Sequence, residues 1–368
     1  MGTKVHAAVM VQARELQVEL LDLDEPHDNE VMVEIAATGV CHSDLSVYRA
    51  VLPTPLPVIL GHESAGVVVG MGSHVSGLAI GDRVVLSLLA QCGNCFYCNH
   101  GQPVLCESGQ PSMLQGTMSD GTTRFAWNGT PVFQMAGLGT LAQRVVVPAS
   151  SVVPIPNSLP LEQAALLGCG VMTGWGAAVN TAKVEVGEAV AVLGCGGVGL
   201  HAVQGARVSG ASMIIAIDPR PDRLELARSL GATHQLQPAP GLVEKVRALT
   251  GGRGVEVALE VAGRQQSIDD AIRMTRRGGR AVIVSAPGKD VVVNISAFGG
   301  LVLTEKTIRG SLYGSAHVRR DIARLVELYD AGKLQLANLA SVIYSLDQVN
   351  EAMAHCAMEE GGRAIVKP

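Results

Sequence analysis

Aromatic side chains are scarce in this chain of 368 residues, making up 3% of it, and charged residues account for only 17%. A core with few aromatic rings must be built from Val, Leu, Ile and Ala, which is typical of strands buried inside a parallel sheet. The net charge is −5, and no long run of basic residues occurs. We therefore expect neither a nucleic-acid partner nor binding to an anionic membrane surface.

Targeting and membrane-spanning segments are also lacking. The N-terminus shows no basic stretch followed by a long apolar one, and residues 5–13 are expected to form a first strand instead. Residues 163–182 and 189–206 contain no Asp, Glu, Lys or Arg, but several glycines and polar residues interrupt both segments. We therefore expect no membrane-spanning helix and a chain that works in the cytoplasm.

Eight cysteines are present, and four of them fall close together at Cys92, Cys95, Cys98 and Cys106. Clustered thiols in a chain without a signal peptide indicate a reducing compartment, where such thiols usually bind metal. Four soft ligands in a short loop favour a closed tetrahedral zinc site. A redox-active pair is one alternative. A zinc ribbon that binds nucleic acid is disfavoured, because residues 88–110 contain no Lys or Arg.

The pattern of apolar runs changes along the chain. Residues 4–40 and 63–90 favour short strands, whereas residues 107–140, rich in Gly, Ser, Thr and Pro, suggest an irregular surface segment. From Glu188 to about residue 313, apolar runs alternate with helical segments, which is the signature of a doubly wound parallel sheet. The fold class is therefore α/β. Two further helices are expected at 318–332 and 347–358.

A glycine-rich turn follows the first of these apolar runs. Residues 194–199, Gly-Cys-Gly-Gly-Val-Gly, match the pattern G-x-G-x-x-G, and Asp218 ends the next strand, 19 residues after Gly199. Such glycines let the backbone approach a pyrophosphate at a helix N-terminus, and the acid can accept hydrogen bonds from ribose hydroxyls. The carboxylate would repel the 2′-phosphate of NADP, although Arg220 and Arg223 leave that choice open. An ordinary strand–turn–helix is the alternative.

A second set of potential metal ligands is dispersed along the chain. Cys41, His62 and Cys169 each follow a glycine within two residues. Two thiolates and one imidazole are suitable zinc ligands. From their spacing alone, however, the same residues can be buried thiols and a core histidine, so the residues by themselves leave this second site open.

Taken together, these motifs resemble those of the zinc-containing alcohol dehydrogenases of the medium-chain family. The resemblance is carried by Gly61-His62-Glu63 with Gly66, by the four-cysteine loop, and by Gly168-Cys169-Gly170-Val171 ahead of the glycine turn, and it covers nearly the whole chain. The retained segment 107–140 is similar to the longer branch, which includes liver-type and glutathione-dependent formaldehyde enzymes, and to actinobacterial relatives.

The resemblance implies a fold and a division of the chain. It implies a Rossmann doubly wound parallel sheet inserted in a mainly-β, GroES-like catalytic domain. The catalytic domain would span residues 1–171 and 314–368, with a NAD-binding domain at 172–313. The resemblance also implies a homodimer, with a tetramer as the alternative.

The family match assigns roles to individual residues. Those implied around a catalytic zinc are the ligands Cys41, His62 and Cys169, Glu63 close behind them, Asp44, which orients the histidine, and Ser43, which takes the alcohol proton. A structural zinc is implied at Cys92, Cys95, Cys98 and Cys106. Contacts to NAD are implied for His42, Thr173, Gly194, Gly196, Gly197, Val198, Gly199, Asp218, Arg223 and Arg363. An apolar substrate pocket is implied at Leu52, Leu88, Met135 and Ala136.

These roles predict zinc-dependent oxidation of primary aliphatic or aromatic alcohols to aldehydes, and the reverse reaction, with hydride transfer to NAD. Ser46 stands where many relatives end the proton relay with a histidine, so the relay must finish through Ser46, water or another group. Gln110 and Leu52 stand where the glutathione-dependent branch has an arginine and an aspartate, which argues against a glutathione adduct as substrate. The alternatives are a thiol-adduct formaldehyde dehydrogenase, linked to mycothiol or glutathione, and a non-catalytic zinc and dinucleotide sensor.

Overall fold

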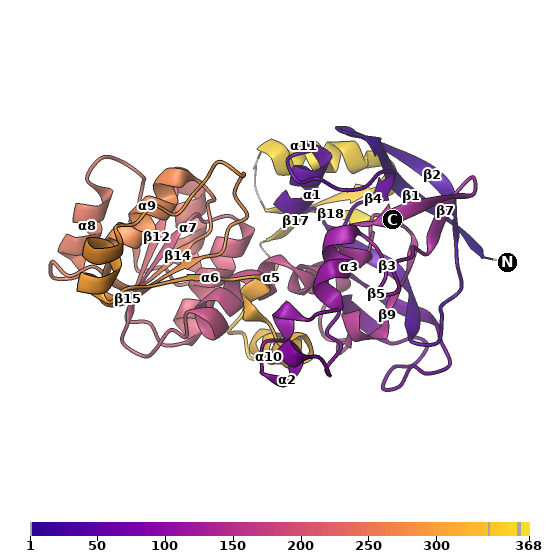
Figure 1. Cartoon of the computed structure of the whole chain (residues 1–368), viewed down its shortest axis with the longest axis horizontal. Coiled ribbons are helices and arrows are strands. Elements are labelled where there is room, and N and C mark those ends of the chain that lie inside the picture. The colour runs from indigo at the N-terminus through magenta and orange to yellow at the C-terminus, as the bar shows by residue number, and fades with distance from the viewer. Residues whose placement is uncertain (1, 338, 359–361) are drawn as a thin grey trace. The chain divides into compact units, whose positions relative to one another are not determined.

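The computed structural model describes residues 2–337, 339–358 and 362–368, and it divides into two compact units (Figure 1). Unit 1 combines Met1–Cys169 with His317–Pro368, and unit 2 is the segment Gly170–Ala316 between them. Unit 1 holds two mainly antiparallel sheets, and unit 2 holds one parallel sheet. The predicted α/β class, with a parallel sheet inserted in a mainly-β part, is therefore confirmed.

Unit 1 is built around two sheets. One is a closed barrel with the strand order β1-β2-β7-β8-β4, and the other has the order β10-β6-β5-β3-β18-β17, with β9 also paired to β3. The barrel strands are β1 (Thr3–Gln12), β2 (Glu15–Leu23), β4 (Val58–Ile59), β7 (Phe125–Trp127) and β8 (Thr130–Gln134). The strands of the second sheet are β3 (Glu30–Gly39), β5 (Glu63–Met71), β6 (Arg83–Leu86), β9 (Arg144–Pro148), β10 (Val152–Pro154), β17 (Ala340–Ser345) and β18 (Arg363–Lys367).

The helices of unit 1 are short, and they connect or flank these sheets. The α-helices are α1 (His42–Tyr48), α2 (Phe96–Asn99), α3 (Gly109–Gln115), α4 (Leu161–Ala165), α10 (Val318–Asp330) and α11 (Val349–Met358). The 3-10 turns are η1 (Pro103–Leu105), η2 (Met135–Gly137), η3 (Ala149–Ser151), η4 (Leu166–Gly168) and η9 (Leu346–Gln348). The last two α-helices lie where the sequence predicts them. The core between the elements is aliphatic, as the scarcity of aromatic residues predicts.

Segment 107–140 is not the irregular surface segment expected from its composition. It contains α3, the antiparallel strands β7 and β8, and η2, and its two strands close the barrel by pairing with β2 and β4. Met118, Phe125 and Val132 are almost fully buried there. The strands are only 3 and 5 residues long and Pro131 interrupts the second, so no alternating pattern could develop.

Unit 2 is a doubly wound sheet. Its strands are all parallel in the order β13-β12-β11-β14-β15-β16, and every residue of the central strand β11 is buried. The strands are β11 (Ala189–Leu193), β12 (Met213–Ile217), β13 (His234–Leu236), β14 (Val255–Glu260), β15 (Thr275–Ile283) and β16 (Thr307–Gly310). Burial of a parallel sheet on both faces explains why its strands β11 and β12 are continuous apolar runs.

Helices accompany the strands of this sheet, and Figure 1 shows α6, α7 and α9 beside β12 and β14. The α-helices of unit 2 are α5 (Gly170–Gly176), α6 (Gly197–Val208), α7 (Pro221–Ser229), α8 (Leu242–Leu249) and α9 (Gln265–Met274). Shorter turns are η5 (Ala177–Thr181), η6 (Ala297–Leu301), η7 (Val302–Thr304) and η8 (Tyr313–Ser315). Across the described ranges of both units, no helix has the length and apolar character needed to cross a membrane.

The strand order of unit 2 reverses between β11 and β14. From β11 the chain moves outward through β12 and β13, and it then returns to build β14, β15 and β16 on the other side. The carboxyl ends of β11 and β14 therefore lie at a topological switch point, where connections leave in opposite directions and a crevice opens. The glycine turn follows β11 at this edge of the sheet.

Candidate metal centres and dinucleotide site

Three dispersed ligands come together in unit 1. Cys41 precedes α1, His62 precedes β5, and Cys169 follows η4. All three residues are buried, and one ligand atom from each lies within 4.8 Å of the others. The Sγ atoms of the two cysteines are 3.9 Å apart. This donor set fits a zinc ion held by three protein ligands, which leaves one coordination position for another molecule.

The Asp44 carboxylate connects two of these ligands. Asp44 lies in the first turn of α1 and is fully buried. Its Oδ2 accepts a hydrogen bond from the backbone N–H of Cys41 at 2.8 Å, and its Oδ1 accepts one from Gly61 N–H at 2.9 Å. The Nδ1 atom of His62 lies 3.2 Å from the same Oδ1. Because Nδ1 faces the carboxylate, Nε2 is the nitrogen that remains available to a metal.

The hydrogen bond between Cys41 and Cys169 favours the thiolate form of Cys41. A hydrogen bond with Cys169 lowers the pKa of the Cys41 thiol well below its usual range; burial opposes this, and the Arg363 charge adds to it. The thiolate is the form of cysteine that binds metal. The same hydrogen bond, together with burial, raises the pKa of the Cys169 thiol well above its usual range, so the pair favours one thiolate and one thiol.

Glu63, which is fully buried, forms an ion pair with the partly buried Arg363, whose charge also acts on Cys41. Arg363 Nη2 lies 2.5 Å from Glu63 Oε2, and Arg363 Nε lies 3.2 Å from Oε1. Burial raises the pKa of the Glu63 carboxyl, and the Arg363 charge opposes that effect. Gly39 leaves room for the carboxylate, because a Cβ at that position would lie 3.0 Å from Glu63 Oε1. The guanidinium that the family match assigns to the cofactor is thus engaged with Glu63 in this structure.

Ser43 offers a hydroxyl beside the three ligands. It is half-buried in α1, and its Oγ lies 3.9 Å from the Sγ of Cys41. His42 is exposed at the start of the same helix. The Oγ of Ser46, one turn later, donates to the His42 carbonyl at 2.9 Å, so that hydroxyl proton is already used within the helix. Among these residues, Ser43 has the hydroxyl nearest a ligand atom.

The four cysteines of the loop between β6 and α3 form a second cluster. Their ligand atoms lie within 4.8 Å of one another, with Cys92 exposed and Cys106 buried. Burial opposes ionisation of Cys106, but hydrogen bonds from the Cys92 N–H and from Ser108 and Gly109 lower the pKa of its thiol to about 6. Four thiolates around one point fit a closed tetrahedral zinc site.

Replacing one cysteine of this loop should lower the stability of the protein without abolishing its turnover. Metal analysis of the wild-type chain should give about two zinc ions per chain, and Cys95→Ser should give about one. The variant should also melt at a lower temperature, because the free energy of structural zinc binding contributes to folding. Its folded fraction should still turn over substrate. Cys356→Ser, a buried cysteine outside both clusters, is the control; undiminished zinc in Cys95→Ser would contradict the assignment.

A third group of possible ligands, His27, Glu30 and Asp120, does not need a metal. The buried guanidinium of Arg124 already lies among them, with Nη2 2.5 Å from Glu30 Oε1 and 2.7 Å from Asp120 Oδ2. The same nitrogen is 3.1 Å from His27 Nδ1. The arginine neutralises both carboxylates, so a cation at this place would meet like charge.

The glycine turn of unit 2 has the geometry that a dinucleotide site requires. Gly194 has φ +99°, which favours glycine, and a Cβ on Gly199 would lie 1.8 Å from the Gly194 carbonyl oxygen. At Gly196 an added Cβ would meet no atom within 4 Å, so the backbone there is open to a ligand. Gly197, Val198 and Gly199 begin α6, whose N-terminus suits a phosphate.

Asp218 lies beside this turn and is 2% exposed. Its Oδ2 accepts from the Cys195 N–H at 2.8 Å, and its Oδ1 accepts from the Arg220 N–H at 2.9 Å. Arg223 Nη1 is 3.9 Å from Oδ2. The carboxylate is therefore fixed in place next to the glycine backbone. Thr173, the other predicted cofactor residue of this unit, is half-buried in α5.

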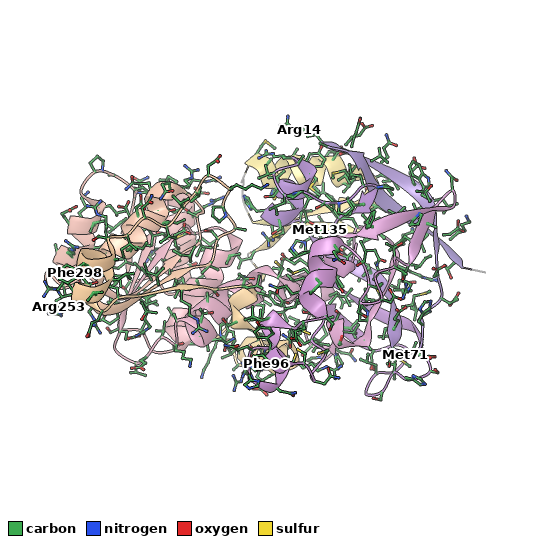
Figure 2. All side chains as sticks on the ribbon, in the orientation of Figure 1. Arg14, Met71, Phe96, Met135, Arg253 and Phe298 are labelled. Carbon is green, nitrogen blue, oxygen red and sulfur yellow. The ribbon has the colours of Figure 1, made fainter. Side chains whose placement is uncertain are left out.

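The predicted pocket residues belong to three segments of unit 1. Leu88 follows β6, and Met135, labelled in Figure 2, begins η2; both pack against the core of this unit. Ala136 adopts φ +58° within η2. Leu52, which follows α1, is 37% exposed. All four offer apolar surface without a charge.

Glu260, the last residue of β14, was not predicted from the sequence as part of a site. It is fully buried, and its carboxylate accepts hydrogen bonds from two backbone N–H groups and two serine hydroxyls. The signal available in the sequence was a single glutamate within the otherwise apolar run Val-Ala-Leu-Glu-Val-Ala at residues 257–262, just before Gly263.

Comparison with known proteins supplies the family. The family model described as alcohol dehydrogenase GroES-like domain matches residues 27–157, and that described as zinc-binding dehydrogenase matches residues 197–331. The chain is 41% identical to the NDMA-dependent alcohol dehydrogenase of Amycolatopsis methanolica over 352 residues, which cover 95% of this chain and 94% of that one. It is 36% identical to the S-(hydroxymethyl)glutathione dehydrogenase of Synechocystis over 354 residues, 95% of each chain. The crystal structure of benzyl alcohol dehydrogenase from Acinetobacter calcoaceticus matches with a TM-score of 0.92 and 32% identity, covering 99% of both chains.

Proposed function

Because the chain belongs to the zinc-binding alcohol dehydrogenase family, we propose that it oxidises uncharged primary alcohols, aliphatic or aromatic, to aldehydes, and catalyses the reverse reaction, with NAD as the hydride carrier. The observation that carries this proposal is the convergence of Cys41, His62 and Cys169 beside the hydroxyl of Ser43. A zinc sensor needs no open coordination position with a proton acceptor next to it, so this arrangement favours an enzyme.

Each group of the site has a distinct task in this proposal. Zinc held by three protein ligands supplies a Lewis acid that lowers the pKa of an alcohol. The Ser43 Oγ accepts the alcohol proton and passes its own proton outward. Asp44 holds Cys41 and His62 in register through its three hydrogen-bond partners. NAD, when bound at the glycine turn, supplies the acceptor for the hydride.

The substrate class follows from the residues assigned to the pocket. Leu52, Leu88, Met135 and Ala136 are apolar, which suits an aliphatic chain or an aromatic ring. A charged thiol adduct would need a counter-charge, and Gln110 and Leu52 provide none. The proposed substrates therefore differ from the S-(hydroxymethyl)glutathione for which the Synechocystis relative is named.

A substrate panel tests the function. We expect a benzyl- or hexanol-like alcohol to be oxidised with NAD at a kcat/KM at least about tenfold above that for formaldehyde with glutathione. That ratio corresponds to about 1.4 kcal/mol, which is less than the cost of an uncompensated charge in an apolar pocket. Formaldehyde with mycothiol is run beside it. Faster turnover of either thiol adduct would contradict the pocket argument. No turnover of any substrate, with both zinc ions present, would favour the sensor.

Asp218 predicts the choice of cofactor. The wild-type chain should use NAD at least about tenfold more efficiently than NADP, because a fixed carboxylate would repel the 2′-phosphate. Asp218→Asn keeps an acceptor oxygen but removes the charge, and it should reduce this preference. Glu185→Gln, which removes an exposed charge before the start of β11, should leave the preference unchanged. Equal use of both cofactors by the wild type would mean that Arg220 or Arg223 neutralises the phosphate.

We further propose that the chain forms a homodimer through the edge of the parallel sheet. β16 is the terminal strand of that sheet. In the segment before it, Phe298, Val302 and Leu303 are 66%, 64% and 59% exposed, and Figure 2 shows Phe298 at the periphery of unit 2. An unpaired strand edge beside exposed apolar side chains favours pairing with a second copy.

We also propose that the chain works in the cytoplasm, because all eight of its cysteines are free thiols, which persist in a reducing compartment.

A further inference from the structure

Glu260 is a buried carboxylate that is not part of the proposed zinc sites. It is the last residue of β14 and is 0% exposed. Its Oε1 accepts hydrogen bonds from the N–H groups of Ala262 at 2.9 Å and Gly263 at 2.7 Å, and from the Ser267 hydroxyl at 2.7 Å. Its Oε2 accepts from the Ser285 hydroxyl. Within the described ranges of the chain, no Lys, Arg or His forms an ion pair with it.

The carboxylate lies at the topological switch point of the sheet. Glu260 is paired with Leu193, the last residue of β11, and the Val261 N–H donates to the Leu193 carbonyl at 2.9 Å. The segment that Glu260 fixes also packs on the glycine turn, because a Cβ on Gly194 would lie 3.0 Å from the Ala262 nitrogen. The Glu260 side chain therefore fixes the segment after β14 against the glycine turn.

Glu260 also holds the segment that follows β15. Besides the bond from the Ser285 hydroxyl, the backbone carbonyl of Glu260 accepts from the N–H groups of Val284 at 2.9 Å and Ser285 at 3.3 Å. These residues follow β15, so Glu260 connects the loops at the carboxyl ends of two adjacent strands. A change in its side chain would weaken the bonds to Ala262 and Gly263 in one loop and to Ser285 in the other, and so would loosen both loops beside the glycine turn.

The negative charge of Glu260 is satisfied by neutral donors only. Hydrogen bonds make a buried carboxylate tolerable, but they do not cancel its field in a low-dielectric interior. In a doubly wound sheet the half beginning with the glycine turn takes the adenosine of a dinucleotide, so the β14–β16 half takes the nicotinamide. The nicotinamide ring is positively charged in NAD⁺ and neutral in NADH, so a nearby fixed negative charge favours the oxidised form.

We propose that Glu260 is a positioning residue of the dinucleotide site, which holds both loops of the crevice and biases the site toward NAD⁺ over NADH. This inference rests on the proposed use of NAD. It predicts two separable effects. The hydrogen bonds control the affinity for both cofactor forms, and the charge controls the ratio of the two affinities.

Two variants separate the effects. Glu260→Gln keeps the shape: its amide oxygen can accept the three bonds made at Oε1, and its amide N–H can donate to Ser285. Glu260→Asp keeps the charge but shortens the side chain. Glu256→Gln, at the opposite end of the same strand, is the matched control. Dissociation constants for NADH and NAD⁺ are measured by fluorescence titration and competition, together with the zinc content and melting temperature of each protein without cofactor.

Glu260→Gln should lower the ratio Kd(NADH)/Kd(NAD⁺) by about three- to tenfold. Glu260→Asp should weaken both forms with the ratio kept, and Glu256→Gln should change neither. If Glu260→Gln does not fold, Ser285→Ala, which retains the charge, should weaken both forms at a constant ratio. An unchanged ratio in a folded Glu260→Gln, or unaltered affinities in Ser285→Ala, would overturn this inference alone. A wild-type chain that binds neither cofactor would overturn it together with the proposed function.

Discussion

Replacing Asp44 with Asn is expected to weaken zinc binding at the Cys41 site by about 10- to 100-fold, which is typical for loss of a carboxylate that orients a metal-binding histidine. The carboxylate serves three donors with two acceptor oxygens: the Cys41 N–H at Oδ2, and the Gly61 N–H and His62 Nδ1 at Oδ1. An amide has one acceptor oxygen, so its NH₂ group must face at least one of these donors. Either Cys41 or His62 then loses its orientation.

The measurement is zinc affinity by competition with a chelator, with activity followed in parallel. Activity should fall with zinc content and recover in part when zinc is added, because all three ligands remain. The zinc of the four-cysteine loop should stay in place, which separates this effect from general unfolding. Asp28→Asn, an exposed aspartate of the same unit, is the control. Wild-type zinc affinity in Asp44→Asn would show that the ligands are held without the carboxylate.

Features whose chemistry lies within a short stretch of chain were predictable from the sequence. The four-cysteine loop places its thiols within residues 92–106, and the glycine turn lies within residues 194–199, so sequence spacing is a good guide to distance in both. The clustering of the four thiols of this loop and the parallel sheet that carries the glycine turn are confirmed. Even the small spaces required at Gly194 and Gly199 follow from the G-x-G-x-x-G pattern.

The dispersed ligands show where spacing ceases to be informative. Cys41, His62 and Cys169 reach one another only because β3, β5 and η4 pack side by side in unit 1. Nothing in their sequence separation states that distance, and the assignment from sequence depended on a family resemblance. Their ligand atoms lie within reach of one ion, while the catalytic roles of the individual residues stay predictions.

Charge partners were the least predictable feature. The guanidinium of Arg363 meets Glu63 across 300 positions of sequence, and Glu260 meets Ser285 across 25. Such pairings are decided by which strands become neighbours, and a single sequence carries no record of that. The segment 107–140 was misjudged for a related reason. Its two short strands gain their stability from pairing with β2 and β4, and not from a pattern of their own.

Replacing Ser43 with Ala is expected to have the largest effect on turnover. Ser43 has the only hydroxyl between Cys41 and Asp44, and its Oγ lies 3.9 Å from the Sγ of Cys41, one of the three proposed zinc ligands. Without it, the alcohol proton has no positioned acceptor. General-base assistance contributes about 10²–10⁴-fold, so Ser43→Ala should lower kcat by about that factor. Ser43→Thr retains a hydroxyl and should keep much of the activity.

The test is the pH–rate profile of the wild type, Ser43→Ala and Ser43→Thr with a good alcohol substrate. Zinc content and NAD affinity should be unchanged, because Ser43 is not one of the three proposed zinc ligands and the Asp44 contacts do not involve its side chain. Ser73→Ala, which removes an exposed hydroxyl bonded to Asp28, is the control.

A primary isotope effect, measured with deuterated alcohol, then identifies the rate-limiting step. If Ser43→Ala keeps the wild-type kcat and shows a full primary isotope effect, hydride transfer limits turnover and the proton leaves by another route, so Ser43 is not the acceptor. If kcat is kept and no isotope effect is seen, a step outside the chemistry limits both proteins, and single-turnover rates must then show the loss that steady-state rates conceal.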